Sequence, residues 1–192
     1  MLEEEYQPRR VLPRLLRAAP EPEAPFSYVL RPAAPTDLPD IREIYNHYVM
    51  NTTVTFDEKQ MSLKEWRTKF AAVNSLGYPF IVAVSPSGQI LGFAYVLPWK
   101  KKAAYRFTVE NSIYLRAAAT GKGLGTALMA KLLDEAGRVG IKEVIAVIAD
   151  RGAESSIRLH EKFGFREIGR MGKVGFKFER WLGTVLMQKS LK

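Results

Sequence analysis

The chain has 192 residues, of which 47% are hydrophobic and 26% charged, and its formal net charge is +9. Such a composition is typical of one globular domain with a sizeable core. The absence of cysteine excludes disulfides, thiolate zinc sites and a covalent cysteine intermediate, and two histidines are too few for a histidine-built metal site. Without a membrane-length apolar run or a signal-peptide pattern at its start, we expect a cytoplasmic protein that binds no metal and no membrane.

Residues 1–27 differ from the rest of the sequence. They hold five of the eleven prolines, lack sustained periodicity and carry a net charge of −1, which leaves +10 for the remainder. We predict a Pro-rich, flexible N-terminal arm at 1–27 and a single domain at 28–192. A basic domain attracts anions, including nucleic acid or a polyphosphate cofactor. The longest basic run, 100–102, has no nucleic-acid motif around it, so we read it as a solvated face and expect no nucleic-acid partner.

Regular patterns begin at Tyr28. A strand is predicted at 28–32, followed by a helix that Thr36 or Asp37 caps. Ser62 and Glu65 form a capping box for a second helix. Hydrophobic periodicity then predicts helices at 123–138 and 153–163, and strands at 80–84, 90–97, 105–115, 144–149, 166–174 and 183–188.

A glycine-rich loop lies between the predicted strand 105–115 and the predicted helix 123–138. Gly121, Gly123 and Gly125 allow backbone N–H groups to approach an anion, and the positive end of the helix faces the same point. The run lacks the Gly-Lys-Ser/Thr ending of a nucleotide-triphosphate loop and is too compact for G-x-G-x-x-G. It is therefore either a phosphate-binding loop of another kind or a strand–helix turn without a ligand.

The segment Thr120-Gly-Lys-Gly123-Leu-Gly125 resembles the pyrophosphate-binding motif of the GCN5-related N-acetyltransferases, which carry Gln or Arg where this chain has Thr120. The predicted order β-α-α-β-β-β-α-β-α-β-β is also that of this family. The resemblance implies an α/β GNAT fold, with a mixed, mostly antiparallel central sheet and helices on both faces. A narrower resemblance, to the phosphinothricin/methionine-sulfone acetyltransferases, extends over segments 41–48, 53–57, 98–100, 104–114, 159–165 and 175–181.

That resemblance implies an acetyl-CoA-dependent N-acetyltransferase. It would transfer the acetyl group directly, in a ternary complex, to the α-amine of phosphinothricin, methionine sulfone or methionine sulfoximine. A protonated amine is no nucleophile, so a base must remove its proton, and the family's glutamate falls on Glu110. Burial in an apolar strand would raise the pKa of Glu110. Without the resemblance, residue alternation does not exclude a glutamate on a solvated strand edge, and that is the more common reading of such a residue.

The resemblance also assigns residues to the coenzyme. Backbone groups of Tyr114 and Leu115 would align the pantetheine and polarise the thioester carbonyl. Lys122 is either a phosphate contact or an exposed lysine, and Arg116 is a weaker phosphate candidate. Ser156 would compensate for an asparagine that relatives carry near Ala153. The complete predicted cofactor set is Tyr114, Leu115, Thr120, Gly121, Lys122, Gly123, Leu124, Gly125, Thr126 and Ser156.

The remaining candidates concern the leaving group and the acceptor. His160 stands where many relatives place a tyrosine that protonates the leaving thiolate, and it is either such a donor or a packed helix histidine. His47 is expected to be structural. The predicted acceptor residues are Phe56, Arg106, Ser112 and Tyr114, and Arg106 can pair with a carboxylate. Phe176 and Trp181 are either core aromatics or contributors to the pocket across the homodimer that the resemblance implies.

Two other functions stay open at this stage. One is an acetyltransferase for another amine, such as a peptide N-terminus, a polyamine or an aminoglycoside; the basic domain repels the cationic acceptors. The other is a non-catalytic module that senses coenzyme A or binds nucleic acid, against which the glycine loop and Glu110 both argue.

Overall fold

The structure is a computed structural model that describes residues 26–192; residues 1–25, and with them nearly all of the predicted arm, lie outside the described part. In that part, no helix has both the length and the apolar character needed to cross a bilayer. The elements follow the predicted order: β1 (Val29–Pro32), α1 (Leu38–Asn51), α2 (Leu63–Ser75), β2 (Phe80–Val84), β3 (Ile90–Pro98), β4 (Thr108–Leu115), α3 (Leu124–Arg138), β5 (Glu143–Ala149), α4 (Glu154–Lys162), β6 (Arg166–Lys177) and β7 (Arg180–Ser190), with 3-10 turns η2 (Pro35–Asp37), η3 (Ala103–Tyr105) and η4 (Ala117–Ala119).

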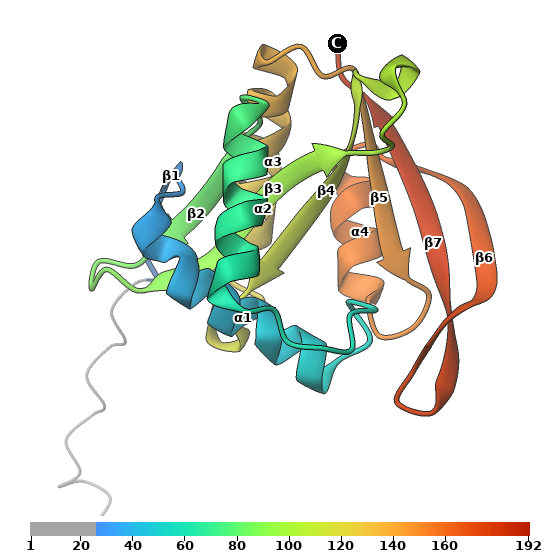
Figure 1. Cartoon of the computed structure of the whole chain (residues 1–192), viewed down its shortest axis with the longest axis horizontal. Helices are drawn as coiled ribbons and strands as arrows, with labels where there is room; N and C mark the ends of the chain where they lie inside the picture. The colour runs from blue at the N-terminus through green and yellow to red at the C-terminus, as the bar shows by residue number, and fades with distance from the viewer. Residues whose placement is uncertain (1–25) are drawn as a thin grey trace, which may run out of the picture.

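One seven-stranded sheet organises the molecule, with strand order β1-β2-β3-β4-β5-β7-β6. Every neighbouring pair is antiparallel except β4 and β5, which are parallel. Helices α1 and α2 cover one face of the sheet, and α3 and α4 lie against the other (Figure 1). The predicted fold class is therefore confirmed.

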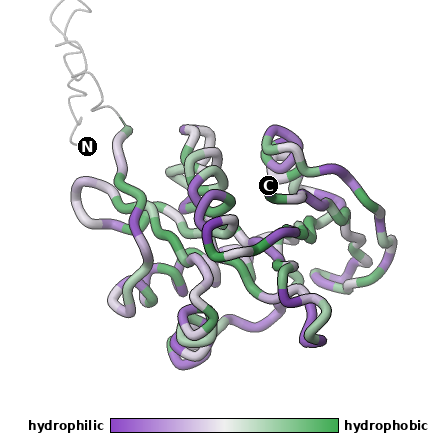
Figure 2. Tube along the Cα trace, turned by 90° about the horizontal axis from the view of Figure 1, so that it is seen from above, coloured by the Kyte–Doolittle hydropathy of each residue, from purple (hydrophilic) through white to green (hydrophobic). Residues whose placement is uncertain are grey.

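Two cores hold the helices against the sheet. The core under α1 and α2 is aromatic, and the fully buried Trp66 lies in edge-on or tilted contact with Tyr45, Phe80, Phe93 and Tyr95. The core under α3 is mainly aliphatic and includes Leu124, Leu128 and Leu132 from that helix. Each helix carries both hydrophobic and hydrophilic residues along its length (Figure 2), so only one stripe of it can face the sheet.

Helix starts were predicted with different success. The capping box of α2 is confirmed: Ser62 Oγ accepts a hydrogen bond from the Glu65 N–H (3.3 Å), and the Glu65 carboxylate accepts one from the Ser62 N–H (2.7 Å). At α1, Asp37 is the N-cap residue, but its side chain does not bond to the helix. Its carboxylate instead accepts from the Ala34 N–H (2.8 Å) and pairs with Arg31 (2.7 Å), which fixes the turn that leads into α1.

The predicted strand 105–115 starts too early. Residues 103–105 form η3, and β4 begins only at Thr108. The apolar residues Tyr105 and Phe107 mimic a strand pattern, but both are exposed, at 41% and 47%. Pairing between β4 and β5 also begins at Thr108, opposite Glu143. Upstream of it, Phe107 O accepts from the N–H groups of Lys142 (2.9 Å) and Glu143 (3.1 Å) at the start of β5.

The last hairpin is longer than predicted. Strands β6 and β7 pair as far as Lys177 and Arg180, which leaves Phe178 and Glu179 as a two-residue turn. Both turn residues have positive φ, 51° and 58°. Such a turn normally contains Asn or Gly, so Phe-Glu gives no turn signal in the sequence.

Candidate active site

The site begins where the two parallel strands separate. Strand β4 pairs with β3 from Val109 to Leu115 but with β5 only from Thr108 to Glu110. Beyond that point a cleft of about 520 Å³ lies between β4 and β5, with the start of α3 at one end and α4 along one side. The gap between the two strands and the position of α4 beside it are visible in Figure 1.

Strand pairing decides which backbone groups face this cleft. The Arg116 N–H donates to Leu91 O on β3 (2.8 Å), and alternate residues of a strand point their backbone groups the same way. Tyr114 therefore points its backbone to β3, whereas Asn111, Ile113 and Leu115 point theirs to the open side. Of the two residues predicted to offer backbone groups, this pattern supports Leu115, whose carbonyl also accepts from the Tyr48 hydroxyl (2.8 Å).

The glycine loop closes one end of the cleft. Gly121 and Gly123 have φ values of 72° and 81°, and Gly123 is the N-cap of α3. Because a side chain is strained in this left-handed region, glycine is required for the loop to present its backbone. Nothing lies within 4 Å of where a Cβ would stand at either position, so the loop is open toward an incoming group. This arrangement fits the pyrophosphate of a coenzyme A.

Other predicted coenzyme residues lie at different depths. Thr120, Thr126 and Ser156 line the cleft, but the Thr120 hydroxyl donates to Ala117 O (2.7 Å) within its own turn. Leu124 is fully buried in the α3 core, so only its backbone can reach a ligand. Lys122 is exposed at the start of α3, with its ammonium 4.9 Å from the centre of the Phe26 ring.

Glu110 lies on the wall of the cleft, at the last paired residue before the strands separate. The side chain is half-buried, and burial raises the pKa of this carboxyl, against the opposing effect of Lys100 and Lys69. Glu110, Ser112 and Tyr114 alternate along β4 and so share the face covered by α1 and α2. The raised pKa makes this carboxylate a better proton acceptor than an exposed glutamate.

His160 forms a bridge between α4 and β4. Its ring is 4% exposed; Nδ1 lies 2.7 Å from Ser156 O and Nε2 lies 2.9 Å from Asn111 Nδ2. A carbonyl accepts only, so Nδ1 carries the proton and Nε2 accepts from the Asn111 amide. Burial also lowers the pKa of His160. A neutral ring in this tautomer has no proton to offer at Nε2, so the geometry favours a positioning role over proton donation.

The predicted acceptor residues are only partly brought together. Ser112 and Tyr114 line the cleft, and burial raises the pKa of Tyr114 well above its usual value. Phe56 lies outside the cleft lining, with its ring against Gly175. Arg106 is exposed beyond the cleft, and its guanidinium carbon lies 4.5 Å from the centre of the Phe107 ring. The cause is the late start of β4, which leaves Arg106 in the loop before the strand.

The last hairpin carries Phe176 and Trp181, which contact each other with ring centres 5.4 Å apart. They are 54% and 58% exposed, so they are not core residues of this chain.

His47 is also exposed, and the Asn51 amide donates to its carbonyl (2.8 Å). Ala153, at the N-cap of α4, is buried and makes no side-chain cap.

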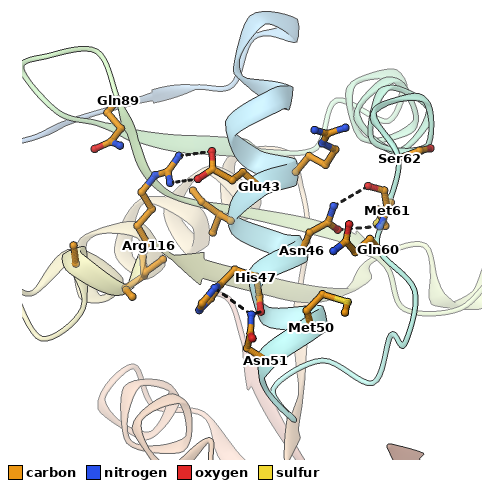
Figure 3. Close-up of a pocket in the computed structure, with 15 residues that line it drawn as sticks. Glu43, Asn46, His47, Met50, Asn51, Gln60, Met61, Ser62, Gln89 and Arg116 are labelled. Atoms are coloured by element: carbon orange, nitrogen blue, oxygen red, sulfur yellow. Dashed lines mark hydrogen bonds and ion pairs between the residues drawn. The ribbon is translucent and has the colours of Figure 1, made fainter. Parts of the chain in front are cut away.

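A second cavity, of about 880 Å³, lies along the outer side of α1. Figure 3 shows that its polar side chains already have partners: Arg116 pairs with Glu43 (2.6 Å), and the Asn46 amide donates to the backbone carbonyl of Met61 (3.0 Å). Arg116 also pairs with Asp40 (2.8 Å). The guanidinium predicted as a weak phosphate contact is therefore committed to two carboxylates. Despite its larger volume, this cavity lacks the open strand edge, the glycine loop and Glu110.

Two cleft residues were missed from the sequence. Tyr48 was assigned only to the apolar stripe of the first helix, yet its hydroxyl bonds to Leu115 O. Asn111 is 7% exposed, and its Oδ1 has no hydrogen-bond partner among the described residues. The available signal was the polar run Glu110-Asn111-Ser112 in the middle of a predicted strand.

Comparison with known proteins agrees with this geometry. Residues 41–165 match the profile of the acetyltransferase (GNAT) family. The chain belongs to this family. Among GNAT relatives, it is 39% identical to a phosphinothricin N-acetyltransferase of Alcaligenes faecalis, over 81% of this chain and 78% of the relative. It is 40% identical to an L-methionine sulfoximine/L-methionine sulfone acetyltransferase of Pseudomonas paraeruginosa, over 86% of this chain and 96% of the relative.

A solved GNAT structure gives the same picture. The phosphinothricin acetyltransferase of Sinorhizobium meliloti, in complex with AcCoA, superposes with a TM-score of 0.82 and is 41% identical, over 86% of this chain and 89% of that one. Membership of this family, with relatives named as N-acetyltransferases, makes the protein an acyltransferase.

Proposed function

We propose that the protein acetylates the α-amine of small amino-acid analogues of the phosphinothricin, methionine sulfone or methionine sulfoximine type, with acetyl-CoA as the donor. The observation that carries this proposal is Glu110, a carboxylate with a raised pKa at the point where β4 and β5 separate. The similarity to acetyltransferases named for these substrates supports the choice of acceptor.

In the proposed reaction, donor and acceptor bind together. The loop 120–123 and the first turn of α3 would hold the pyrophosphate, and the open backbone of β4 would pair with the amides of the pantetheine arm. Glu110, directly or through a water, takes a proton from the substrate ammonium. The free amine attacks the acetyl carbonyl carbon, a C–N bond forms, and the C–S bond breaks. The nitrogen gives up its second proton to solvent, and the departing thiolate takes up a proton from solvent and leaves as free coenzyme A. His160 holds α4 against β4 through Asn111.

The test is thiol release from acetyl-CoA with a panel of acceptors. We expect saturable turnover with phosphinothricin, methionine sulfone and methionine sulfoximine, and none with a polyamine, because the chain has a net charge of +9. Turnover of a peptide N-terminus or a polyamine alone would contradict the proposed acceptor. Binding of acetyl-CoA without any turnover would contradict the proposed activity and favour a non-catalytic coenzyme sensor.

Replacement of the proposed base gives a sharper test. Glu110→Gln keeps the shape of the side chain and removes the proton acceptor, so we expect kcat to fall strongly near neutral pH and less at high pH, where the amine loses its proton unaided. In the wild type, activity should fall as the pH drops through the raised pKa of Glu110. A kcat of Glu110→Gln equal to that of the wild type near neutral pH would exclude Glu110 as the base. The homodimer and the cytoplasmic location stay predictions.

A further inference from the structure

Lys177, near the end of β6, is a buried charge that the proposed reaction does not use. The side chain is 3% exposed. Its ammonium donates to two backbone carbonyls, Thr52 O at 2.9 Å and Thr55 O at 2.8 Å. An ammonium is expensive to remove from water unless it is hydrogen-bonded. These two bonds therefore tie the loop after α1 to the last hairpin, across more than 120 positions of sequence.

The loop that Lys177 holds, residues 52–57, borders the cleft. Val54 lines the cleft itself. The Thr53 hydroxyl donates to Arg151 O (3.1 Å) in the segment before α4. On the other side, the Tyr45 hydroxyl bonds to both Thr55 and Asp57 beneath α1. The loop thus connects the α1 face, which carries Tyr114 and Glu110, with the α4 side of the cleft.

Strand β6 shapes the same loop at a second point. A Cβ at Gly175 would stand 2.5 Å from the Phe56 ring, so the absence of a side chain there lets the ring lie against the strand. Residues 175 and 177 are two positions apart, so they face the same side of β6. One side of this strand therefore receives the Phe56 ring and donates to the carbonyls of Thr52 and Thr55.

We propose that Lys177 is a positioning residue for the amine acceptor: its ammonium fixes the curvature of loop 52–57 and so sets the wall of the acceptor pocket beside Tyr114, on the face of β4 that also carries Glu110. The side chain is too deeply buried to touch a substrate itself. The inference rests on the proposed function, in that the acceptor approaches Glu110 on the α1 side of β4. It adds the last hairpin to the elements that decide acceptor affinity.

The experiment compares Lys177→Met with Lys173→Met. The first substitution keeps an unbranched side chain and removes the ammonium; the second removes a lysine that is exposed on the same strand. For Lys177→Met we expect the KM of phosphinothricin or methionine sulfone to rise about tenfold, because a loop that has lost both anchors is in the binding-competent conformation only about one tenth of the time. We expect the dissociation constant of acetyl-CoA to stay within about twofold of the wild type, since the loop 120–123 and α3 are untouched. Lys173→Met should change neither value.

Gly175→Ala and hydrogen exchange separate an effect on loop 52–57 from a general loss of folding. Gly175→Ala displaces Phe56 without touching the ammonium and should also raise the acceptor KM. Hydrogen exchange at residues 52–58 should become faster in Lys177→Met and stay unchanged in Lys173→Met. An unchanged acceptor KM with unchanged exchange would overturn the proposal, as would a parallel loss of kcat, acetyl-CoA affinity and thermal stability. If the wild type turns over no acceptor, the proposed function has failed, and the exchange data alone decide whether Lys177 fixes the loop.

Discussion

Gly92 offers the most direct test of how the end of β4 is held. It lies on β3, opposite Leu115 of β4. A Cβ added there would stand 2.6 Å from Leu115 Cδ2, 2.9 Å from Tyr114 O and 3.3 Å from Leu115 Cα. The leucine side chain can rotate away, but the other two atoms are backbone. Gly92→Ala must therefore push the end of β4, the strand that forms one wall of the cleft.

The size of the effect follows from two opposing contributions. Overpacking a tight site costs about 1–3 kcal/mol, and the backbone neighbours place Gly92 in the upper part of that range. Alanine has less conformational entropy than glycine in the unfolded chain, and this raises the free energy of unfolding by about 0.4–1 kcal/mol. A net loss of about 1–2 kcal/mol corresponds to a Tm lower by roughly 2–8 °C for a chain of this size. Because Tyr114 and Leu115 must move, the dissociation constant of acetyl-CoA should rise as well.

Gly137→Ala is the matched control, since it makes the same chemical change elsewhere. Gly137 lies in α3, and nothing lies within 4 Å of its added Cβ. Alanine is favoured over glycine in a helix by about 0.5–1 kcal/mol, so this variant should be more stable than the wild type and bind acetyl-CoA equally well. Calorimetric unfolding of the three proteins is the assay. A Gly92→Ala protein as stable as the wild type would refute the steric reasoning.

Two further predictions concern the cleft. Gly125→Ala has room in the structure, since its Cβ would lie 3.5 Å from Leu159 Cδ2, and alanine keeps the backbone N–H, so thermal unfolding and acetyl-CoA titration should both stay near the wild type. Gly123→Ala is strained at φ 81° and should bind acetyl-CoA more weakly; full affinity of this variant would contradict a role for the loop in holding the coenzyme. Burial lowers the pKa of His160 below its ordinary value of 6.5. On acidification the unfolded chain therefore takes up a proton at this histidine before the folded chain does. Stability is lost as the pH falls from 6.5 toward the lowered pKa. His160→Gln removes this contribution, and its Tm should fall less than that of the wild type between about pH 7.5 and pH 5; equal slopes would contradict the assignment.

Much of the fold could be predicted because its signals are local. The apolar run of β5 and the capping box at Ser62 depend on residues close in sequence, and the structure confirms both. The errors have non-local causes. Phe107 looks like a strand residue until the parallel pairing with β5, which starts only at Thr108, is known. The turn at Phe178 and Glu179 is imposed by the two paired strands, and neither residue is of a type that normally forms such a turn.

The candidate site shows the same division. The glycine loop was predicted from its own spacing, whereas Glu110 was assigned only through the family resemblance; the structure places both on one cleft. The Asn111–His160 bond joins residues 49 positions apart, and the hydrogen bonds of Lys177 reach even further along the chain. Only the tertiary structure could reveal such partners. The placement of Arg106 was likewise unpredictable, because it depends on where β4 begins.

The separation of β4 from β5 has a consequence for how such a protein can change through mutation. The edge it exposes consists of peptide groups, which every amino acid except proline supplies in full. Substitutions along β4 therefore leave this edge largely intact, whereas the neighbouring loop 52–57 is shaped by individual side chains such as Phe56 and Lys177. Under the proposed function, mutations in loop 52–57 can change which acceptor is bound, whereas coenzyme binding at the β4 edge is inherited almost unchanged.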